Sequence, residues 1–304
     1  MLYVNEKIAE LRSNFYLLTC LFFTPTTICI MIIRFIKTHK LGIQVTKSFN
    51  GWSIFTLSIY LVMLSVCVSD KLHAKEYIIG VEDVSYYPFY DFSAKQSNQK
   101  SFSKELLSTF FQQHGYKFQF VSLPVKRFDK WFAEESIDFK FPDNVRWRSA
   151  ESKKLNISYS KPILHLTSGS YVLKKNRNLP EQAIKRLGTM YGFYPTLWVE
   201  RVRNNSIEIV ESKSTFSLVK HLLHGNLDAI NIEKNVIDHV LKGMGREKDE
   251  IVLNLQAKHE RYAFHFSTIL HPEILQEFNE FLNTHSKQIA ELKRKYGIIE
   301  ALAN

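Results

Sequence analysis

The hydrophobic residues of this 304-residue chain divide it into two parts. Two apolar runs, residues 15–35 and 54–68, lie within the first 74 residues, and the polar stretch SDKLHA follows the second run. Only the first run is long enough to span a bilayer, which takes roughly 20 residues. The second run has the length of a signal-peptide core, and the sequence LHA places a small residue where signal peptidase cuts. The pattern therefore predicts export, with a mature chain that starts near Lys75.

The charges between the two runs leave two explanations for the first one. Four basic residues lie between residues 34 and 47, which by the positive-inside tendency keeps that loop in the cytoplasm. Either residues 15–35 form a transmembrane helix, or the assigned start is too early and translation begins at a non-Met codon near residue 41 or 45. We favour the early start. A lipoprotein would be anchored through Cys67, but Val66 then occupies a position that prefers a small residue.

From Lys75 onward the pattern alternates between strand and helix. Apolar runs and period-two alternation predict strands over residues 77–81, 116–121 and 137–141. Apolar residues at helical spacing predict helices over residues 103–114 and 125–134, between those strands. This β-α-β-α-β order is typical of a parallel sheet with helical crossovers.

A second α/β unit begins near residue 166. Its predicted strands cover residues 170–173, 189–192, 207–211, 227–232, 251–255 and 262–266. Its predicted helices cover residues 180–186, 196–203, 215–224 and 235–242, and two more follow at 272–285 and 287–296. Ser214 is expected to cap the helix that follows it. The last two helices exceed what the second unit needs.

Charge and cysteine content exclude several classes of function. The 40 Lys and Arg residues against 30 Asp and Glu residues give a net charge of +10, and residues 1–74 hold seven of the former and three of the latter. The remaining +6 is interspersed rather than gathered in a stripe, so we expect no nucleic-acid binding. All three cysteines precede residue 75, which leaves the mature chain without a disulfide or a thiolate metal site.

No catalytic or cofactor signature is present. The sequence lacks G-x-S-x-G, H-E-x-x-H and the phosphate-binding G-x-x-x-x-G-K-[ST]. His221 and His224 are three residues apart on one predicted helix, but no third metal ligand accompanies them. We therefore expect no enzyme, no cofactor and no metal.

From residue 76 to residue 298 the chain resembles the bacterial extracellular solute-binding proteins of family 3, which have the type II periplasmic-binding-protein fold. The resemblance rests on ordered stretches of sequence rather than on one strict motif. These stretches are IGVED with YYPF at 79–89, FSKELLSTFFQQHG at 102–115, IDF at 137–139, SYSKP at 158–162, GNLDAI at 225–230 and the closing helices at 272–298.

The resemblance implies an α/β fold of two lobes that two hinge crossovers join. Residues 75–165 and 262–304 would form lobe 1, residues 166–261 would form lobe 2, and residues 1–74 would be the hydrophobic region with the signal peptide. The closing helices would then return to lobe 1. The implied function is that of a periplasmic protein that captures a small polar solute, such as an amino acid or a related compound, for an inner-membrane transporter.

The candidate ligand contacts follow from position in the predicted strands. Ligands in open α/β sheets lie outside the carboxyl ends of the strands, where loops and helix N-termini gather. Glu82 and Asp83 end the first strand and an aromatic cluster follows, while Asp143 and Asn144 follow the third strand. By resemblance, Glu233 lies where amino-acid binders carry an acidic residue for the ligand's amino group. The expected contacts are Asp83, Tyr86, Tyr87, Phe89, Asp143, Asn144, Arg146, Arg148 and Glu233.

One position departs from the family pattern. The amino-acid binders of this family carry an arginine that holds the ligand carboxylate through two hydrogen bonds. By spacing that position falls near Lys153, and the nearest arginines are Arg146 and Arg148. Lysine offers a point charge rather than a fork, so amino-acid specificity does not follow from the resemblance.

Three functions stay open at this point. The first is delivery of a small-molecule ligand to an inner-membrane transporter, and the second is sensing, with the ligand-closed form presented to a membrane receptor. The third is a dehydratase-like enzyme built on the same cleft. We expect a monomer in the periplasm, held at the membrane if the hydrophobic runs are retained.

Overall fold

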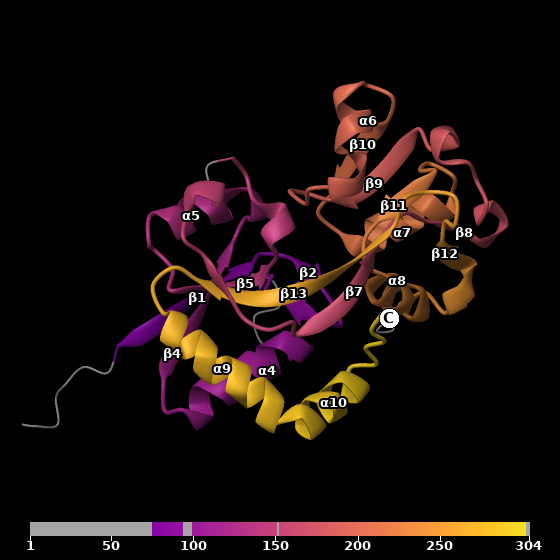
Figure 1. Cartoon of the computed structure of the whole chain (residues 1–304). Helices are drawn as coiled ribbons and strands as arrows, with labels where there is room; N and C mark the ends of the chain where they lie inside the picture. Colours follow the sequence, from indigo (N-terminus) through magenta and orange to yellow (C-terminus); the bar gives the residue numbers. More distant parts are fainter. Residues whose placement is uncertain (1–74, 94–98, 151, 302–304) are drawn as a thin grey trace, which may run out of the picture. The chain divides into compact units, whose positions relative to one another are not determined.

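The structure is a computed structural model, and it describes residues 75–93, 99–150 and 152–301 (Figure 1). The chain separates into one unit of residues 1–73 and another of residues 74–304, and the described residues belong to the second. The predictions for the hydrophobic runs at 15–35 and 54–68 and for the signal peptide lie outside the described residues. Within the described ranges, no helix combines the length and apolar character that a bilayer crossing requires.

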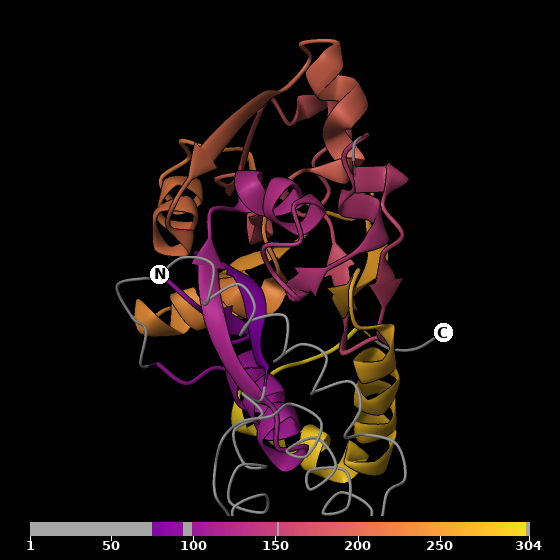
Figure 2. The same cartoon turned by 90° about the vertical axis from the view of Figure 1, so that its left-hand side faces the viewer.

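The first sheet contains the predicted β-α-β-α-β order. Its strand order is β4-β1-β5-β13-β6, with β7 paired to β13, and β1 runs parallel to both β4 and β5. Strands β4 and β1 lie side by side at the front of Figure 2. The elements are β1 (Glu76–Glu82), α4 (Phe102–Gln113), β4 (Lys117–Leu123), α5 (Phe128–Ala133), β5 (Phe139–Asp143), β6 (Ser158–Tyr159), β7 (Leu164–Ser168) and β13 (Glu260–Thr268).

The second sheet, like the first, combines parallel and antiparallel strands. Its order is β10-β9-β11-β8-β12, where β9 runs parallel to β10 and β11, and β8 runs antiparallel to β11 and β12. The elements are β8 (Tyr171–Leu173), β9 (Arg186–Met190), α6 (Val199–Arg203), β10 (Glu208–Ser212), α7 (Thr215–Leu223), β11 (Ala229–Asn231), α8 (Lys234–Gly243) and β12 (Ile251–Leu253).

Two strands carry the chain between the sheets. Strand β7 leads out of the first sheet toward β8, and β13 returns from β12, so the two run antiparallel to each other. Their register pairs Leu164 with Phe264 at one end and Ser168 with Glu260 at the other. These two strands are the crossovers that the sequence led us to expect, and Figure 1 shows them side by side.

The closing helices pack on the first sheet and its helix α4. Helix α9 (Pro272–Thr284) packs against β13 and β6, and α10 (Ser286–Lys295) packs against α4. The rings of Phe110 and Phe278 join α4 to α9, with centroids 5.0 Å apart. On the sheet, Phe139 and Phe266 stack at 4.7 Å, and both are fully buried. The closing helices thus contribute to the first sheet's core.

Two predicted elements of the second unit were misplaced. Residues 180–186 form only a three-residue 3-10 turn, Glu181–Ala183, and the strand predicted over 189–192 is β9, which begins at Arg186. The side chains from Leu187 to Met190 are buried almost completely, so burial on both faces favours a strand there. The predicted cap is confirmed, since the Ser214 hydroxyl accepts a hydrogen bond from the Ser217 backbone N–H at 3.3 Å.

Candidate functional site

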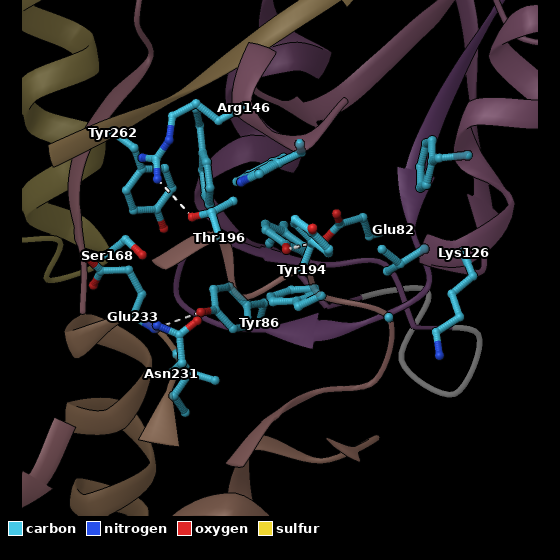
Figure 3. A pocket seen from close by; sticks show the side chains of 18 of the residues that line it. Glu82, Tyr86, Lys126, Arg146, Ser168, Tyr194, Thr196, Asn231, Glu233 and Tyr262 are labelled. Carbon is cyan, nitrogen blue, oxygen red and sulfur yellow. Dashed lines mark hydrogen bonds between the residues drawn. The ribbon is translucent and has the colours of Figure 1, made fainter. Parts of the chain in front are cut away.

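A cavity of about 230 Å³ is lined by residues of both sheets (Figure 3). Its walls come from the carboxyl ends of parallel strands, where ligand sites in open α/β sheets lie. Glu82 is the last residue of β1, Asn231 is the last residue of β11, and Gly192 opens the turn beyond β9. Gly192 has a φ of +90°, a conformation that favours glycine. A Cβ there would lie 3.0 Å from the Val125 side chain, so the two sides approach closely at this rim.

Eight of the residues that line the cavity are aromatic. The centroids of the Tyr86 and Tyr90 rings lie 5.5 Å apart. The Tyr86 ring also meets the ring of Phe193, which follows β9 of the second sheet, edge to face at 5.3 Å. Such pairs contribute about 0.5–1.5 kcal/mol beyond the burial of their surface. The aromatic residues of the lining are Tyr86, Tyr90, Phe128, Trp147, Phe193, Tyr194, Tyr262 and Phe264.

Glu82 is the acidic group at the end of β1. Its side chain is buried, and the Tyr90 hydroxyl donates a short hydrogen bond to its Oε2. Burial raises the pKa of Glu82 to about 7, because the charged form loses its hydration, while the Tyr90 hydrogen bond and the positive charge of Lys140 oppose the shift. The carboxyl group therefore changes its charge close to neutral pH.

The three basic side chains of the lining each have an acidic partner. Lys140 is buried on β5, with its Nζ 3.3 Å from Asp143 and 3.8 Å from Asp129. Arg146 forms an ion pair with Glu260 at the start of β13 and donates to the Thr196 hydroxyl at 2.8 Å. Lys126 lies 3.2 Å from Glu211 of β10.

Glu233 is engaged by three N–H groups. It is the N-cap of α8, and its carboxylate accepts from the backbone and side-chain N–H groups of Asn235 at 3.0 and 3.1 Å. It also accepts from the Thr167 backbone N–H at 3.1 Å, which ties the end of β7 to α8. The Glu233 backbone N–H donates to the Tyr86 hydroxyl at 2.7 Å, so a hydrogen bond also crosses the cavity here.

Comparison with known proteins agrees at the level of the fold. No family model and no curated protein sequence matches this chain. Among solved structures, the arginine-, lysine-, histidine-binding protein ArtJ from Geobacillus stearothermophilus is 15% identical, with a TM-score of 0.57 over 75% of this chain and 97% of that chain. A histidine kinase sensor domain with similarity to periplasmic binding proteins is 13% identical, with a TM-score of 0.58 over 75% and 98%.

A third match is an ancestral amino acid-binding protein described as a precursor of cyclohexadienyl dehydratase. It is 16% identical, with a TM-score of 0.53 over 73% of this chain and 95% of that chain. The chain has the type II periplasmic-binding-protein fold. The first sheet with the closing helices is one lobe, the second sheet is the other, and β7 and β13 are the crossovers between them.

Three of the nine expected contact residues line the cavity between the lobes. These are Tyr86, Arg146 and Glu233. Arg146 comes from a 3-10 turn after β5, Val145–Trp147, which Asn144 caps by accepting from the Arg146 backbone N–H at 2.9 Å. Glu233 lines the cavity, but its carboxylate accepts hydrogen bonds from the backbone N–H groups of Thr167 and Asn235.

The other six expected residues lie outside the lining. Asp83 is exposed beyond β1, Phe89 is fully buried in the core, and the Tyr87 ring packs on His239 at 4.2 Å. Asp143 and Arg148 form a short ion pair with each other, and the Tyr159 hydroxyl accepts from Arg148 at 2.5 Å. Asn144 donates to the Ala263 carbonyl at 2.8 Å.

Several lining residues were not selected from the sequence. The turn after β9 contributes Phe193, Tyr194 and Thr196, and β13 contributes Tyr262 and Phe264. The signal for the first three was their position just beyond β9, which was predicted to end at Gly192 and ends at Met190. Glu82 was named with Asp83 at the end of the first strand, and the structure gives the cavity position to Glu82 rather than to Asp83.

Proposed function

We propose that this protein is an exported solute-binding protein that encloses one small solute between its lobes and catalyses no reaction. One observation carries the proposal: the cavity is lined from both lobes by aromatic faces and by a few charged groups. Such a lining supplies apolar contact and orientation together, as small-molecule sites do. The volume of about 230 Å³ lies below the range of about 300–1,000 Å³ that suits drug-sized ligands, so a smaller solute is expected.

The contacts across the cavity support capture by closure of the lobes. The Tyr86 hydroxyl, the Arg146 guanidinium and the Lys126 ammonium each reach a partner of the second lobe, at 2.7, 2.8 and 3.2 Å. In two-lobed binding proteins a hinge lets such contacts form and break, and a ligand that binds the closed form shifts that equilibrium. We propose residues 75–165 with 262–304 as lobe 1 and residues 166–261 as lobe 2, in a monomer exported to the periplasm.

A thermal-shift screen of the purified protein against amino acids, amines, organic acids and small peptides tests the proposal. A solute present at 100 times its Kd stabilises the folded state by about 2.7 kcal/mol, which raises the melting temperature by about 5–10 °C in a protein of this size. Phe193→Ala removes a cavity ring and should reduce that shift. Phe216→Ala removes a ring that is 53% exposed and should leave it unchanged. The proposal fails if no polar solute shifts the melting temperature.

The partner is a transporter or a receptor in the inner membrane. The similar structures include the substrate binding protein of an amino acid ABC transporter and a histidine kinase sensor domain, so both roles are built on this fold. We propose the transporter role. It predicts that deletion of the gene abolishes uptake of the bound solute, whereas a receptor role predicts normal uptake and loss of a transcriptional response to that solute.

An enzyme on this cleft would use Glu82. A carboxyl with a pKa of about 7 can exchange protons near neutral pH, and one similar structure is described as the precursor of a dehydratase. Incubation of each stabilising solute with the protein, followed by mass spectrometry, distinguishes the two functions. A binding protein returns the solute unchanged, whereas net loss of water with repeated turnover would replace our proposal.

A further inference from the structure

The basic side chains that line the cavity are neutralised by acidic partners, so the positive and negative charges offered to a ligand are not equal. Glu260 and Glu211 neutralise Arg146 and Lys126, while Lys140 lies between two aspartates. No basic side chain of the lining is therefore left to balance a negative charge on a ligand. This matters because an anion enters a low-dielectric cavity only where an uncompensated cation or free N–H groups receive it.

The charge of Glu82, in contrast, is not neutralised by a partner in this way. Among the described residues, the neutral Tyr90 hydroxyl is the hydrogen-bond donor that reaches its carboxyl group, and it binds Oε2. Oε1 therefore remains available to a donor from the cavity. The cation that acts on Glu82 is Lys140, whose charge Asp143 and Asp129 already share. The unbalanced charge of the cavity is thus negative and lies at the end of β1.

The surroundings of Glu82 favour a cation as well. The Tyr90 ring, whose hydroxyl binds Glu82, lies 5.5 Å from the Tyr86 ring, and the face of an aromatic ring attracts an ammonium or guanidinium group. The Lys140 ammonium already lies 5.1 Å from the centre of the Phe128 ring. A cationic ligand would therefore find both a carboxylate and ring faces at one end of the cavity.

The basic groups that could bind a ligand carboxylate are paired or lie outside the lining. The Arg148 guanidinium is 3% exposed and lies outside the cavity lining, with its Nε on the Tyr159 hydroxyl and its Nη2 on Asp143. Its Nη1 makes no hydrogen bond and lies 3.9 Å from Asp129. The Glu233 side chain already accepts from an N–H group in the first turn of α8. Among the described residues of the lining, a ligand carboxylate would therefore meet acidic groups and no basic side chain without an acidic partner.

We propose that the cavity binds a small organic cation that carries no carboxylate, an amine or guanidine whose charged nitrogen donates to Glu82 while its body packs on the aromatic wall. This inference rests on the proposed function, because it names the class of solute that the cavity takes. The inference predicts different affinities for two compounds of nearly equal size, an amino acid and the amine that results when its carboxylate is removed.

Matched pairs of compounds test this choice. Calorimetric titration of the purified protein would compare tyramine with tyrosine, histamine with histidine and agmatine with arginine. We expect the amine to bind at least about tenfold more tightly than its amino acid in any pair that binds, since an unpaired buried carboxylate costs more than one such factor. Equal or tighter binding of the amino acid would overturn the inference and leave the binding function intact.

Two other outcomes also decide between the claims. If solutes outside these pairs bind and none of the amines does, the amine assignment is wrong and the binding function stands. If no solute of any class binds, the proposed function fails and the assignment fails with it. The two failures are therefore distinguishable in one set of titrations.

A variant and a proton count test the role of Glu82 directly. Glu82→Gln keeps the acceptor for Tyr90 and removes the charge, so amine affinity should fall at least about tenfold, the loss expected for a hydrogen bond to a charged group. Asp249→Asn makes the same change in a surface ion pair with Lys174 and should leave affinity unchanged.

If Glu82→Gln fails to fold, titration of the wild-type protein at pH 6 in two buffers of different ionisation enthalpy replaces it. Amine binding should release protons at this pH, because the bound cation holds Glu82 ionised. Binding without proton release would contradict the placement of the ligand nitrogen at Glu82.

Discussion

Two buried glutamates on opposite sides of the cavity have nearly the same burial and different roles. Glu82 is 5% exposed and Glu233 is 4% exposed, and each lies at the carboxyl end of a parallel strand. Glu233 accepts three N–H hydrogen bonds that join β7 to α8, whereas Glu82 accepts one hydroxyl and keeps an oxygen open to the cavity. Burial alone therefore does not distinguish the two carboxyl groups. The hydrogen bonds made by their oxygen atoms do, and they are the basis for proposing Glu82 as the ligand contact.

The largest expected effect separates the two residues by stability. Glu233→Ala removes the cap of α8 and leaves the buried N–H groups of Thr167 and Asn235 without their acceptor, so the free energy of unfolding should fall by about 2–4 kcal/mol. Urea denaturation measures it. Ser214→Ala removes an exposed cap of α7 and should cost only about 1 kcal/mol. A loss at Glu233 no larger than at Ser214 would show that its carboxylate is not structural.

The next effect is a pH dependence that belongs to Glu82. Its pKa is about 7 in the folded state and 4.5 in the reference state, so the folded protein holds the proton more tightly between these values. The resulting stabilisation is complete below pH 4.5 and is lost as the pH rises through about 7, by up to about 1.4 kcal/mol per pH unit. The groups that act on Glu82 are Tyr90, Lys140 and Asp143.

Melting curves of the ligand-free protein from pH 5 to pH 8 test this. Wild type should lose stability relative to Glu82→Gln as the pH rises, since only the wild-type carboxyl must give up its proton. Amine affinity should change in the opposite direction and rise with pH over the same interval. Parallel stability curves for the two proteins would mean that Glu82 is already ionised at pH 5.

A smaller effect is expected at the hydrogen bond that joins the two sides. Tyr86→Phe removes the hydroxyl that accepts from the Glu233 backbone N–H and keeps the ring against Phe193. The loss should be about 1 kcal/mol of closed-state stability, which appears as a ligand affinity up to about fivefold weaker. Tyr194→Phe changes another tyrosine of the lining, one that is 58% exposed, and serves as the control. Equal effects of both variants would argue against a cross-lobe role for Tyr86.

The smallest effect is expected at the rim. Lys126 and Glu211 join the lobes through an ion pair whose side chains are 51% and 33% exposed. Water and salt screen such a pair, so Lys126→Met should change solute affinity less than about threefold, and 0.5 M salt should remove the difference. A loss of tenfold or more would place Lys126 in contact with the solute.

The periodicity of the chain predicted most of the fold. Helical spacing located α4, period-two alternation located β4, and apolar runs located β1 and β5. At β9, which is buried on both faces, the predicted strand began three residues late and ended two residues late. Phe193, Tyr194 and Thr196 follow the end of that strand, and their residue types alone do not mark them as cavity residues.

The site itself was only partly predictable. Position after a strand identified Tyr86, and the family resemblance identified Glu233 and directed attention to Arg146. The ion pairs that decide which charges are available were not predicted, and some of them join distant segments. Arg148 pairs with Asp143 and Arg146 pairs with Glu260, which is more than 100 residues away in the chain. No local pattern in the sequence indicates the second pairing.

The crystal structure of the protein with its most stabilising solute tests the central claim most directly. We predict solute density in the cavity lined by Glu82, Tyr86 and Phe193, with a nitrogen of the solute about 2.7–3.2 Å from the Glu82 carboxyl. Density outside the cavity would contradict the proposed binding site. A solute carboxylate bound by Arg146 or Lys140 would instead contradict the preference for a cation.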